Sequence, residues 1–348
     1  MGVTIKDVAK AAGVSISTVS KVLNGHYSIS EDTQARVRQV IRELNYYPSA
    51  SAQSFAKGTT RTVIVLTDLG PNITFSNPHM FEIIAGMEEV LRARNYRLIL
   101  CGAQPAAACE MAEEFISRRS ADALAIHVSI MTHQLAALLV RTHFPHIVLG
   151  KPTFDSQVCW IDINNISSGI IAAAHLTQEG YERIAFLGGQ DHDRNSAHRL
   201  EGIRQGLESV GLALDDQYIW LGDSTPADGL RMADKLLSRE PLPDAVVCAN
   251  NYIALGCVSA IRERGLEIPG QIAVMTFDEH PFSQIMEPPL TVVDIDVRGM
   301  GSQAGKFLLD IIRHPNTQVQ TYVTTSNLII RESTARRNGR AKNTASSA

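Results

Sequence analysis

Residues 9–25 read AKAAGVSISTVSKVLNG, and they hold two short helical segments separated by a glycine turn. Apolar residues recur at the helical spacing i, i+3, i+4 and i+7 before the glycine, and a second apolar stripe follows it. Gly13 can take the left-handed conformation that ends a helix, and Ser15 can cap the next helix. The first stripe is Ile5, Val8, Ala9 and Ala12, and the second is Val19, Val22 and Leu23.

The flanking residues extend this pattern to three helices. Thr4 can cap the first helix, with Asp7 placed three residues later to return the hydrogen bond. Ser30 can cap a third helix, and Glu31 and Asp32 suit the positive end of its dipole. The apolar face of that helix is Val37, Val40, Ile41 and Leu44. We therefore expect an all-α unit of three helices at the start of the chain.

The second helix presents small polar side chains and one cation outward, namely Ser17, Thr18, Ser20 and Lys21. Such a helix fits the major groove of DNA, where hydroxyls and a lysine reach bases and phosphates. The solvated face of an ordinary three-helix bundle fits the periodicity equally well. Residues 1–60 carry a net charge of +3, whereas the rest of the chain carries −7. A basic end on an acidic body indicates nucleic acid at that end.

Composition places the whole chain among globular proteins of more than one domain. Its 348 residues are 45% apolar and 20% charged. We find no run of about 18 apolar residues and no signal peptide, and we expect a cytoplasmic protein without a membrane partner. The five cysteines are scattered, which argues against a disulfide framework or a zinc site. No nucleophile elbow, Walker loop or metal-spaced ligand set appears, so we expect neither an enzyme nor a cofactor or metal.

From Arg61 onward, short apolar runs alternate with helical stretches. This alternation predicts doubly wound parallel sheets with helices on both faces, in which ligands bind beyond the carboxyl ends of the strands. The expected strands span residues 62–68, 97–103, 122–128, 146–150, 183–189, 244–250, 271–277 and 290–296. The expected helices span residues 79–94, 106–119, 132–142, 165–179, 197–210, 227–239, 252–264 and 297–313.

Residues 4–58 resemble the helix-turn-helix headpiece of the LacI/GalR family of bacterial transcription regulators. The stretches TIKDVAKAAGVS, STVSKVLNG and ELNYYPSASAQSFAKG carry the resemblance. It implies that residues of the second helix meet operator DNA, with Ile16, Ser17 and Lys21 at bases and Thr18, Ser20 and Asn24 at phosphates.

The same resemblance implies a hinge helix that folds only on DNA. Phe55 stands at the position that wedges into the minor groove, where the family usually has leucine, and Ala52 lets two hinge helices cross closely. The alternative for Phe55 is contact with the headpiece or the sensor. The predicted DNA-binding residues are Lys6, Ile16, Ser17, Thr18, Ser20, Lys21, Asn24, Ala52, Phe55 and Lys57.

Residues 61–336 resemble the family's sensor, which shares its fold with periplasmic sugar-binding proteins. The resemblance implies two similar lobes, a ligand between them, and crossings between the lobes near residues 162, 290 and 322. We expect a headpiece over residues 1–48, a hinge and linker over 49–60, a sensor over 61–336 and a disordered tail over 337–348. Within the sensor, the first lobe spans about 61–161 and 293–321, and the second spans about 162–292 and 322–336.

Polar side chains at strand ends of the sensor match ligand contacts of the family. Arg199, Asn250 and Asp278 supply a guanidinium, an amide and a carboxylate, which together suit sugar hydroxyls. A surface pair of Arg199 with Glu201, and a helix-capping role for Asp278, are the alternatives. The predicted effector-binding residues are His79, Met80, Ser129, Arg199, Ser224, Asn250 and Asp278.

These features predict a homodimeric repressor that reads a pseudo-palindromic operator and is found on the nucleoid when bound to DNA. A mono- or disaccharide is the expected effector, since NPHMF, LGKP and MEPPLTVVDID are similar to maltose-type regulators. A nucleobase or a partner protein is the alternative effector. A sugar-binding transport protein is the alternative of another class, but it leaves residues 4–58 without a role.

Overall fold

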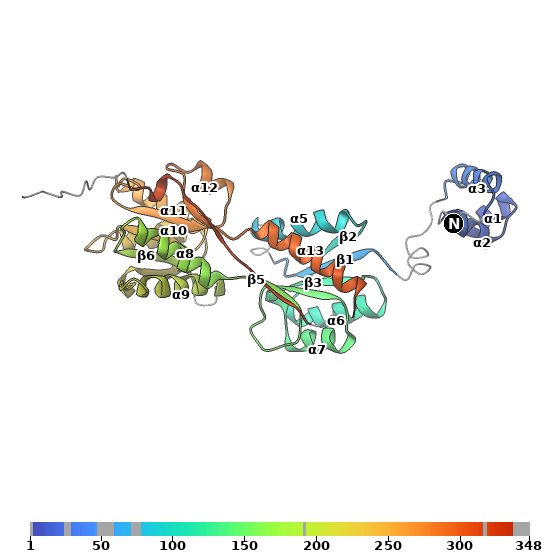
Figure 1. Ribbon diagram of the computed structural model, residues 1–348, viewed down its shortest axis with the longest axis horizontal. Helices are drawn as coiled ribbons and strands as arrows, with labels where there is room; N and C mark the ends of the chain where they lie inside the picture. Colours follow the sequence, from blue (N-terminus) through green and yellow to red (C-terminus); the bar gives the residue numbers. More distant parts are fainter. Residues whose placement is uncertain are drawn as a thin grey trace, which may run out of the picture.

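The computed structural model describes residues 3–23, 29–46, 59–70, 78–190, 193–315 and 319–336. Three helices with their own apolar core form the amino-terminal unit (Figure 1). They are α1 (Ile5–Ala12), α2 (Ile16–Leu23) and α3 (Glu31–Glu43). One valine from each helix is fully buried where the three meet, namely Val8, Val19 and Val37. The three helices expected from the sequence are therefore present.

Capping side chains fix where α1 and α2 begin. The Asp7 carboxylate accepts hydrogen bonds from the backbone N–H and the hydroxyl of Thr4, at 2.8 and 2.7 Å. Ser15 Oγ accepts the N–H of Thr18 at 3.1 Å, as expected of an N-cap. The predicted Ser30 cap is wrong at the side-chain level, because the Ser30 hydroxyl donates to Thr33 Oγ1 and caps no backbone N–H.

The first lobe contains a six-stranded sheet with the strand order β11-β5-β4-β3-β1-β2, and neighbouring strands are parallel. Its strands are β1 (Thr62–Thr67), β2 (Arg97–Gly102), β3 (Ala123–His127), β4 (His146–Leu149), β5 (Trp160–Ile163) and β11 (Thr321–Thr324). Its helices are α5 (Pro78–Arg92), α6 (Pro105–Ser117), the short η1 (Val128–Ile130), α7 (His133–Thr142) and α13 (Val297–Arg313).

The second lobe repeats this plan with the strand order β12-β10-β9-β8-β6-β7, in which β12 alone is antiparallel to its neighbour. Its strands are β6 (Ile184–Gly189), β7 (Ile219–Gly222), β8 (Ala245–Cys248), β9 (Ala273–Phe277), β10 (Thr291–Asp294) and β12 (Asn327–Ile329). Its helices are α8 (Asn165–Gln178), α9 (Arg194–Glu208), η2 (Asp216–Tyr218), α10 (Pro226–Leu236), α11 (Asn251–Glu263), α12 (Pro281–Ile285) and η3 (Glu332–Thr334).

Strand β1 shows why helices cover both faces of each sheet. Side chains alternate between the faces of a strand, so Val63 and Val65 enter the core beneath α5 and α13. Ile64 and Leu66 enter a separate core beneath α6 and α7. The sheet is thus buried on both sides, as its continuous apolar sequence predicts. Among the described residues, no helix is both long enough and apolar enough to cross a bilayer.

Four strands and one helix were not predicted from the apolar pattern of the sequence. Strands β7, β11 and β12 lie at sheet edges and are only partly buried, so their sequences lack a continuous apolar run. Strand β5 carries Asp162 in the middle of its four residues, and α12 has only five residues. Short or half-exposed elements are those that periodicity detects least well.

The chain crosses between the lobes three times, and the crossings lie one, four and two residues beyond the predicted positions. It passes from β5 to α8 after Ile163, from β10 to α13 after Asp294, and from β11 to β12 after Thr324. The structure therefore has all three crossings near the predicted residues 162, 290 and 322. Strands β5, β10 and β11 continue their ladders past those positions, which apolar content alone does not reveal.

The residues that lead into the first lobe are tied to it by one carboxylate. Asp122, just before β3, accepts hydrogen bonds from the Thr59 hydroxyl, from the Thr60 N–H and hydroxyl, and from the Arg61 N–H. Asp244 takes the equivalent place before β8, where it accepts the N–H groups of Glu182 and Arg183. Each aspartate joins the chain that enters one strand, β1 or β6, to the start of the neighbouring strand, β3 or β8.

Candidate functional site

The outer face of α2 carries the residues predicted to meet DNA. Ile16 is 44% exposed, although it is a large apolar residue, and Ser17 and Lys21 are also exposed. Ser15 Oγ is hydrogen-bonded to the hydroxyls of both Ser17 and Thr18, which orders this first turn. Thr18 and Ser20 are half-buried on the same helix, and Lys6 is exposed on α1; the predicted residues Asn24, Ala52, Phe55 and Lys57 lie outside the described residues.

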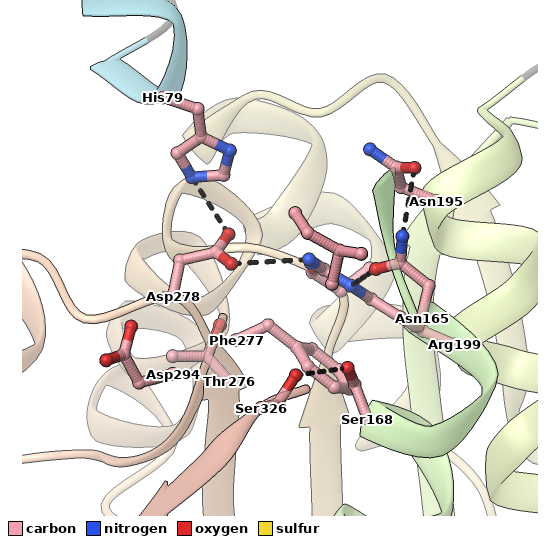
Figure 2. Close-up of polar contacts among 12 residues, drawn as sticks. His79, Asn165, Ser168, Asn195, Arg199, Thr276, Phe277, Asp278, Asp294 and Ser326 are labelled. Atoms are coloured by element: carbon pink, nitrogen blue, oxygen red, sulfur yellow. Dashed lines mark hydrogen bonds and ion pairs between the residues drawn. The ribbon is translucent and has the colours of Figure 1, made fainter. Parts of the chain in front are cut away.

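Arg199 on α9 is the centre of a buried polar network in the second lobe. Its guanidinium is almost fully buried and lies 4.4 Å from the centre of the Phe277 ring. Nε donates to Asn165 Oδ1 at 2.9 Å, and Nη1 donates to the Ala249 carbonyl at 2.6 Å. Nη2 donates to Asp278 Oδ1 at 3.2 Å (Figure 2). A buried guanidinium that donates from all three of its nitrogens holds its neighbours in fixed positions.

Two glycines bring α8 and α9 close enough for this network. A Cβ atom on Gly202 would lie 1.9 Å from the Ile166 carbonyl oxygen, and one on Gly169 would lie 2.2 Å from the Arg199 carbonyl oxygen. Only glycine permits so close a contact between the two helix backbones. The contact places Asn165, at the first turn of α8, beside the Arg199 side chain, and Asn165 in turn donates to Asn195 Oδ1.

Asp278 follows the carboxyl end of β9 in an uncommon backbone conformation. Its φ of +73° lies in the left-handed region, which costs free energy for a residue other than glycine. Burial raises the pKa of Asp278, but the charges of Arg199 and His79 more than offset it, and the pKa falls to about 2. The buried carboxyl is therefore ionised at neutral pH.

His79 reaches this carboxylate from the other lobe. It lies in the first turn of α5, and its Nε2 is 2.9 Å from Asp278 Oδ2 (Figure 2). Its side chain is 30% exposed, whereas that of Asp278 is 3% exposed. Burial lowers the pKa of His79, and the carboxylate of Asp278 raises it by more, so that the pKa is above its ordinary value. The sequence-predicted residues His79, Arg199 and Asp278 thus meet at one place between the lobes.

The other predicted effector residues have local partners. Asn250 caps α11 by accepting the Ile253 N–H, and Ser129 lies 2.7 Å from His127 Nδ1. Ser224 is exposed and donates weakly to Asp193 Oδ2 at 3.5 Å. Met80 is buried in the first lobe, with 5% of its surface exposed.

Both structural alternatives from the sequence are wrong. Glu201 accepts a hydrogen bond from Gln205, and Arg199 binds Asp278. His280 caps α12, so Asp278 does not have that role. Asn165 and Asn251 were not predicted from the sequence. Asn251 donates hydrogen bonds to the carbonyls of Phe277 and Asp278. Their positions at the first turns of α8 and α11 are the signal that could have found them.

The described residues contain no cluster of three or more histidine, cysteine or carboxylate side chains that could hold a metal ion. The family model described as "Bacterial regulatory proteins, lacI family" matches residues 4–49. "Periplasmic binding protein-like domain" matches residues 173–334. With the three-helix unit and the two parallel-sheet lobes, these matches define the class of the protein: a DNA-binding transcription regulator with a periplasmic-binding-protein-like body.

Individual relatives identify the family. The HTH-type transcriptional repressor PurR of Haemophilus influenzae (strain PittEE) is 33% identical over 336 residues, which cover 95% of this chain and 98% of that protein. The chain belongs to the LacI family of bacterial regulators, and it is a DNA-binding transcriptional repressor and not an enzyme.

Two solved structures have the same architecture. The Lac repressor dimer bound to operator and the anti-inducer ONPF aligns with a TM-score of 0.84 at 24% identity, over 96% of this chain and 99% of that one. The complex of the transcriptional regulator CelR with cellobiose aligns with a TM-score of 0.69 at 28% identity, over 95% of this chain and 99% of that one.

Proposed function

We propose that a small-molecule effector binds where His79, Arg199 and Asp278 meet, and that its binding changes the affinity of the repressor for operator DNA. The observation that carries the proposal is the meeting itself: a buried guanidinium–carboxylate pair of the second lobe faces an imidazole of the first. A ligand that binds both sides of such a junction stabilises one arrangement of the lobes over another. Differential affinity for two arrangements is what an effector requires.

A mono- or disaccharide is the effector that these side chains suit best. Charged donors and acceptors match sugar hydroxyls, and the 28% identical CelR structure was solved with cellobiose. A purine is the second candidate, since the relatives at 33% identity are named PurR. Tyr252, His280 and Phe282 form an aromatic group close to Asp278, and its rings offer faces for a base.

A thermal-unfolding screen with cellobiose, maltose, adenine and guanine tests the effector site. A ligand at about 100 times its Kd stabilises the folded protein by about 2.7 kcal/mol, which a melting curve detects easily. The Arg199→Met variant should lose the shift produced by the active compound. A shift with purines alone would overturn the sugar assignment, and a shift that persists in Arg199→Met would overturn the site.

We also propose the functional division of the chain: a DNA-binding headpiece over residues 1–48, a hinge over 49–60, a sensor over 61–336 and a tail over 337–348. Two chains pair, so that two headpieces read a pseudo-palindromic operator. Analytical ultracentrifugation and footprinting test this arrangement. A monomer bound to a single half-site would overturn it.

Asp122 connects the linker to the first lobe, and its loss should uncouple effector from operator. In Asp122→Asn, one oxygen acceptor becomes an NH2 donor that faces other donors. We expect the free energy of unfolding to fall by about 1–3 kcal/mol, and the effect of the effector on operator binding to weaken. Asp244→Asn is the matched control, since it breaks the equivalent bonds in the second lobe and leaves the linker intact.

Urea unfolding and gel-shift titrations with and without effector measure the two quantities. Both variants should be destabilised by a similar amount, and only Asp122→Asn should lose the response of DNA binding to effector. Equal responses in the two variants would show that the Asp122 contacts do not transmit the signal.

A further inference from the structure

Two polar contacts between described residues join the lobes close to the proposed effector site. Arg194 Nη1, on α9, donates to the carbonyl oxygen of Lys151, which follows β4, at 2.9 Å. His79 Nε2 and Asp278 Oδ2 form the other contact, also at 2.9 Å. The first contact joins a guanidinium to a backbone carbonyl. The second joins an imidazole to a carboxylate, so its strength depends on the proton that His79 carries.

Charged and titratable groups from both lobes lie around His79. From the second lobe, Asp278 and Arg199 face it, and His280 at the start of α12 interacts with it electrostatically. From its own helix comes Glu82, which Arg298 on α13 engages at 3.3 Å. The repulsion from Arg199 is smaller than the attraction to Asp278, because the imidazole nitrogen is in direct contact with the carboxylate.

Asp278 is also the acceptor that the proposed effector would use. Arg199 Nη2 occupies one carboxylate oxygen, and His79 lies against the other. The carboxylate oxygen that Arg199 does not contact therefore faces the first lobe, on the side from which His79 approaches (Figure 2).

We propose that His79 is a built-in occupant of the effector site, which holds the two lobes together through Asp278 when no effector is bound. The inference rests on the proposed function in one respect, namely that the effector needs the same carboxylate. His79 is then both a lobe-to-lobe contact and a competitor that the effector must displace.

The direction of the pH dependence follows from the contact. The pKa of His79 is raised when it meets Asp278, so the protonated form favours closed lobes. The contact has its full strength below the ordinary pKa of histidine, about 6.5, and weakens as the pH rises through the higher pKa of the closed form. Opening the lobes, by effector or otherwise, releases a proton to solvent in that window.

Lobe separation in the full-length, ligand-free protein tests the inference. Donor and acceptor fluorophores on unnatural amino acids at the exposed positions Glu113 and Glu208 report the distance between α6 and α9. Unlabelled chains are added in excess, so that energy transfer takes place within one chain. In the wild type, energy transfer should fall as the pH rises from about 6 to about 9. In His79→Ala it should be low and independent of pH, and in His79→Gln it should be independent of pH.

The matched control is His314→Ala. His314 pairs with Asp310 at 3.1 Å on the surface of α13, within one lobe, so its loss removes a histidine–aspartate pair without touching the junction. In this variant, energy transfer should depend on pH as it does in the wild type.

The inference also predicts a change in ligand affinity. His79→Ala should bind any active compound up to about fivefold more tightly than the wild type at about pH 6, since a partly exposed ion pair contributes up to about that factor.

Each result has one meaning. Loss of the pH response in both His79 variants, with the response kept in His314→Ala, supports the inference. A wild type without a pH response, or a His79→Ala variant that titrates like the wild type, overturns it. The energy-transfer samples contain no ligand, so the thermal screen is a separate test: if no sugar or purine shifts the melting of any variant, the effector site fails and the lobe contact is unaffected.

Discussion

Replacing Arg199 with methionine is expected to lower the free energy of unfolding at pH 7 by about 3–5 kcal/mol, as is typical when one partner of a buried ion pair is removed. Asp278 would then remain buried without its main counter-charge, and the hydrogen bonds to Asn165 and the Ala249 carbonyl would be lost. Methionine fills part of the volume beside Phe277, so that the effect reports the charge more than a cavity.

The pH dependence of this variant gives an independent check. In the wild type the pKa of Asp278 is about 2 in the folded chain and has its ordinary value of about 3.8 in the unfolded chain. A depressed pKa contributes stability above the unfolded value, and that stability is lost as the pH falls through the folded value. Without Arg199, burial raises the pKa of Asp278, so the deficit of the variant should be largest at pH 7 and shrink toward about pH 3.

Urea unfolding followed by circular dichroism measures both effects. Arg204→Met is the matched control on the same helix, because Arg204 forms an exposed pair with Asp216 and should change stability by less than about 0.5 kcal/mol. The double variant Arg199→Met with Asp278→Asn should regain part of the lost stability. If Arg199→Met unfolded like Arg204→Met, the buried network would not exist in solution.

The sequence predicts the headpiece well because its signals are local. The stripe from Ile5 to Ala12, the turn at Gly13 and the cap at Ser15 all act within four residues, and the structure has each of them. Central strands such as β1 and β9 are equally clear, since burial on both faces requires a continuous apolar run. Strands β7 and β11 are not, because an edge strand is stabilised by its neighbour and needs few apolar residues.

The candidate site shows where local signals end. Arg199 and Asp278 were each predicted beside a local alternative, and the choice depends on a contact between residues 79 positions apart. His79 is still farther away in the sequence, on the other lobe. No periodicity reports such pairs, and only the folded chain shows that the three side chains meet.

The residues predicted to bind effector but engaged elsewhere illustrate a second limit. The carboxyl end of every strand in a parallel sheet points to the same edge, so polar residues there are all candidates from sequence alone. A helix that follows the strand also needs an N-cap, and Asn250 meets that need at α11. Local capping and ligand binding therefore compete for the same positions, and the sequence does not separate the two uses.

Reversing the charge of Lys21 is expected to weaken operator binding by at least about a hundredfold. Lys21 is exposed in the last turn of α2, beside the other residues predicted to face DNA. A lost contact to DNA costs about 1–3 kcal/mol, and in the proposed dimer both headpieces lose it, while glutamate adds repulsion from phosphates. If Lys21 meets a phosphate, the slope of log affinity against log salt should fall by about one per headpiece.

Fluorescence anisotropy with an operator selected from a random library by the wild-type protein measures this loss. Arg38→Glu is the matched control, because Arg38 is exposed on α3 of the same unit and the change in charge is identical. Nonspecific electrostatics predicts equal losses for the two variants, whereas insertion of α2 into the groove predicts a much larger loss for Lys21→Glu. Since neither side chain belongs to the headpiece core, the free energy of unfolding of both variants should stay within about 1 kcal/mol of the wild-type value. Equal affinities would mean that another element of the headpiece reads the operator.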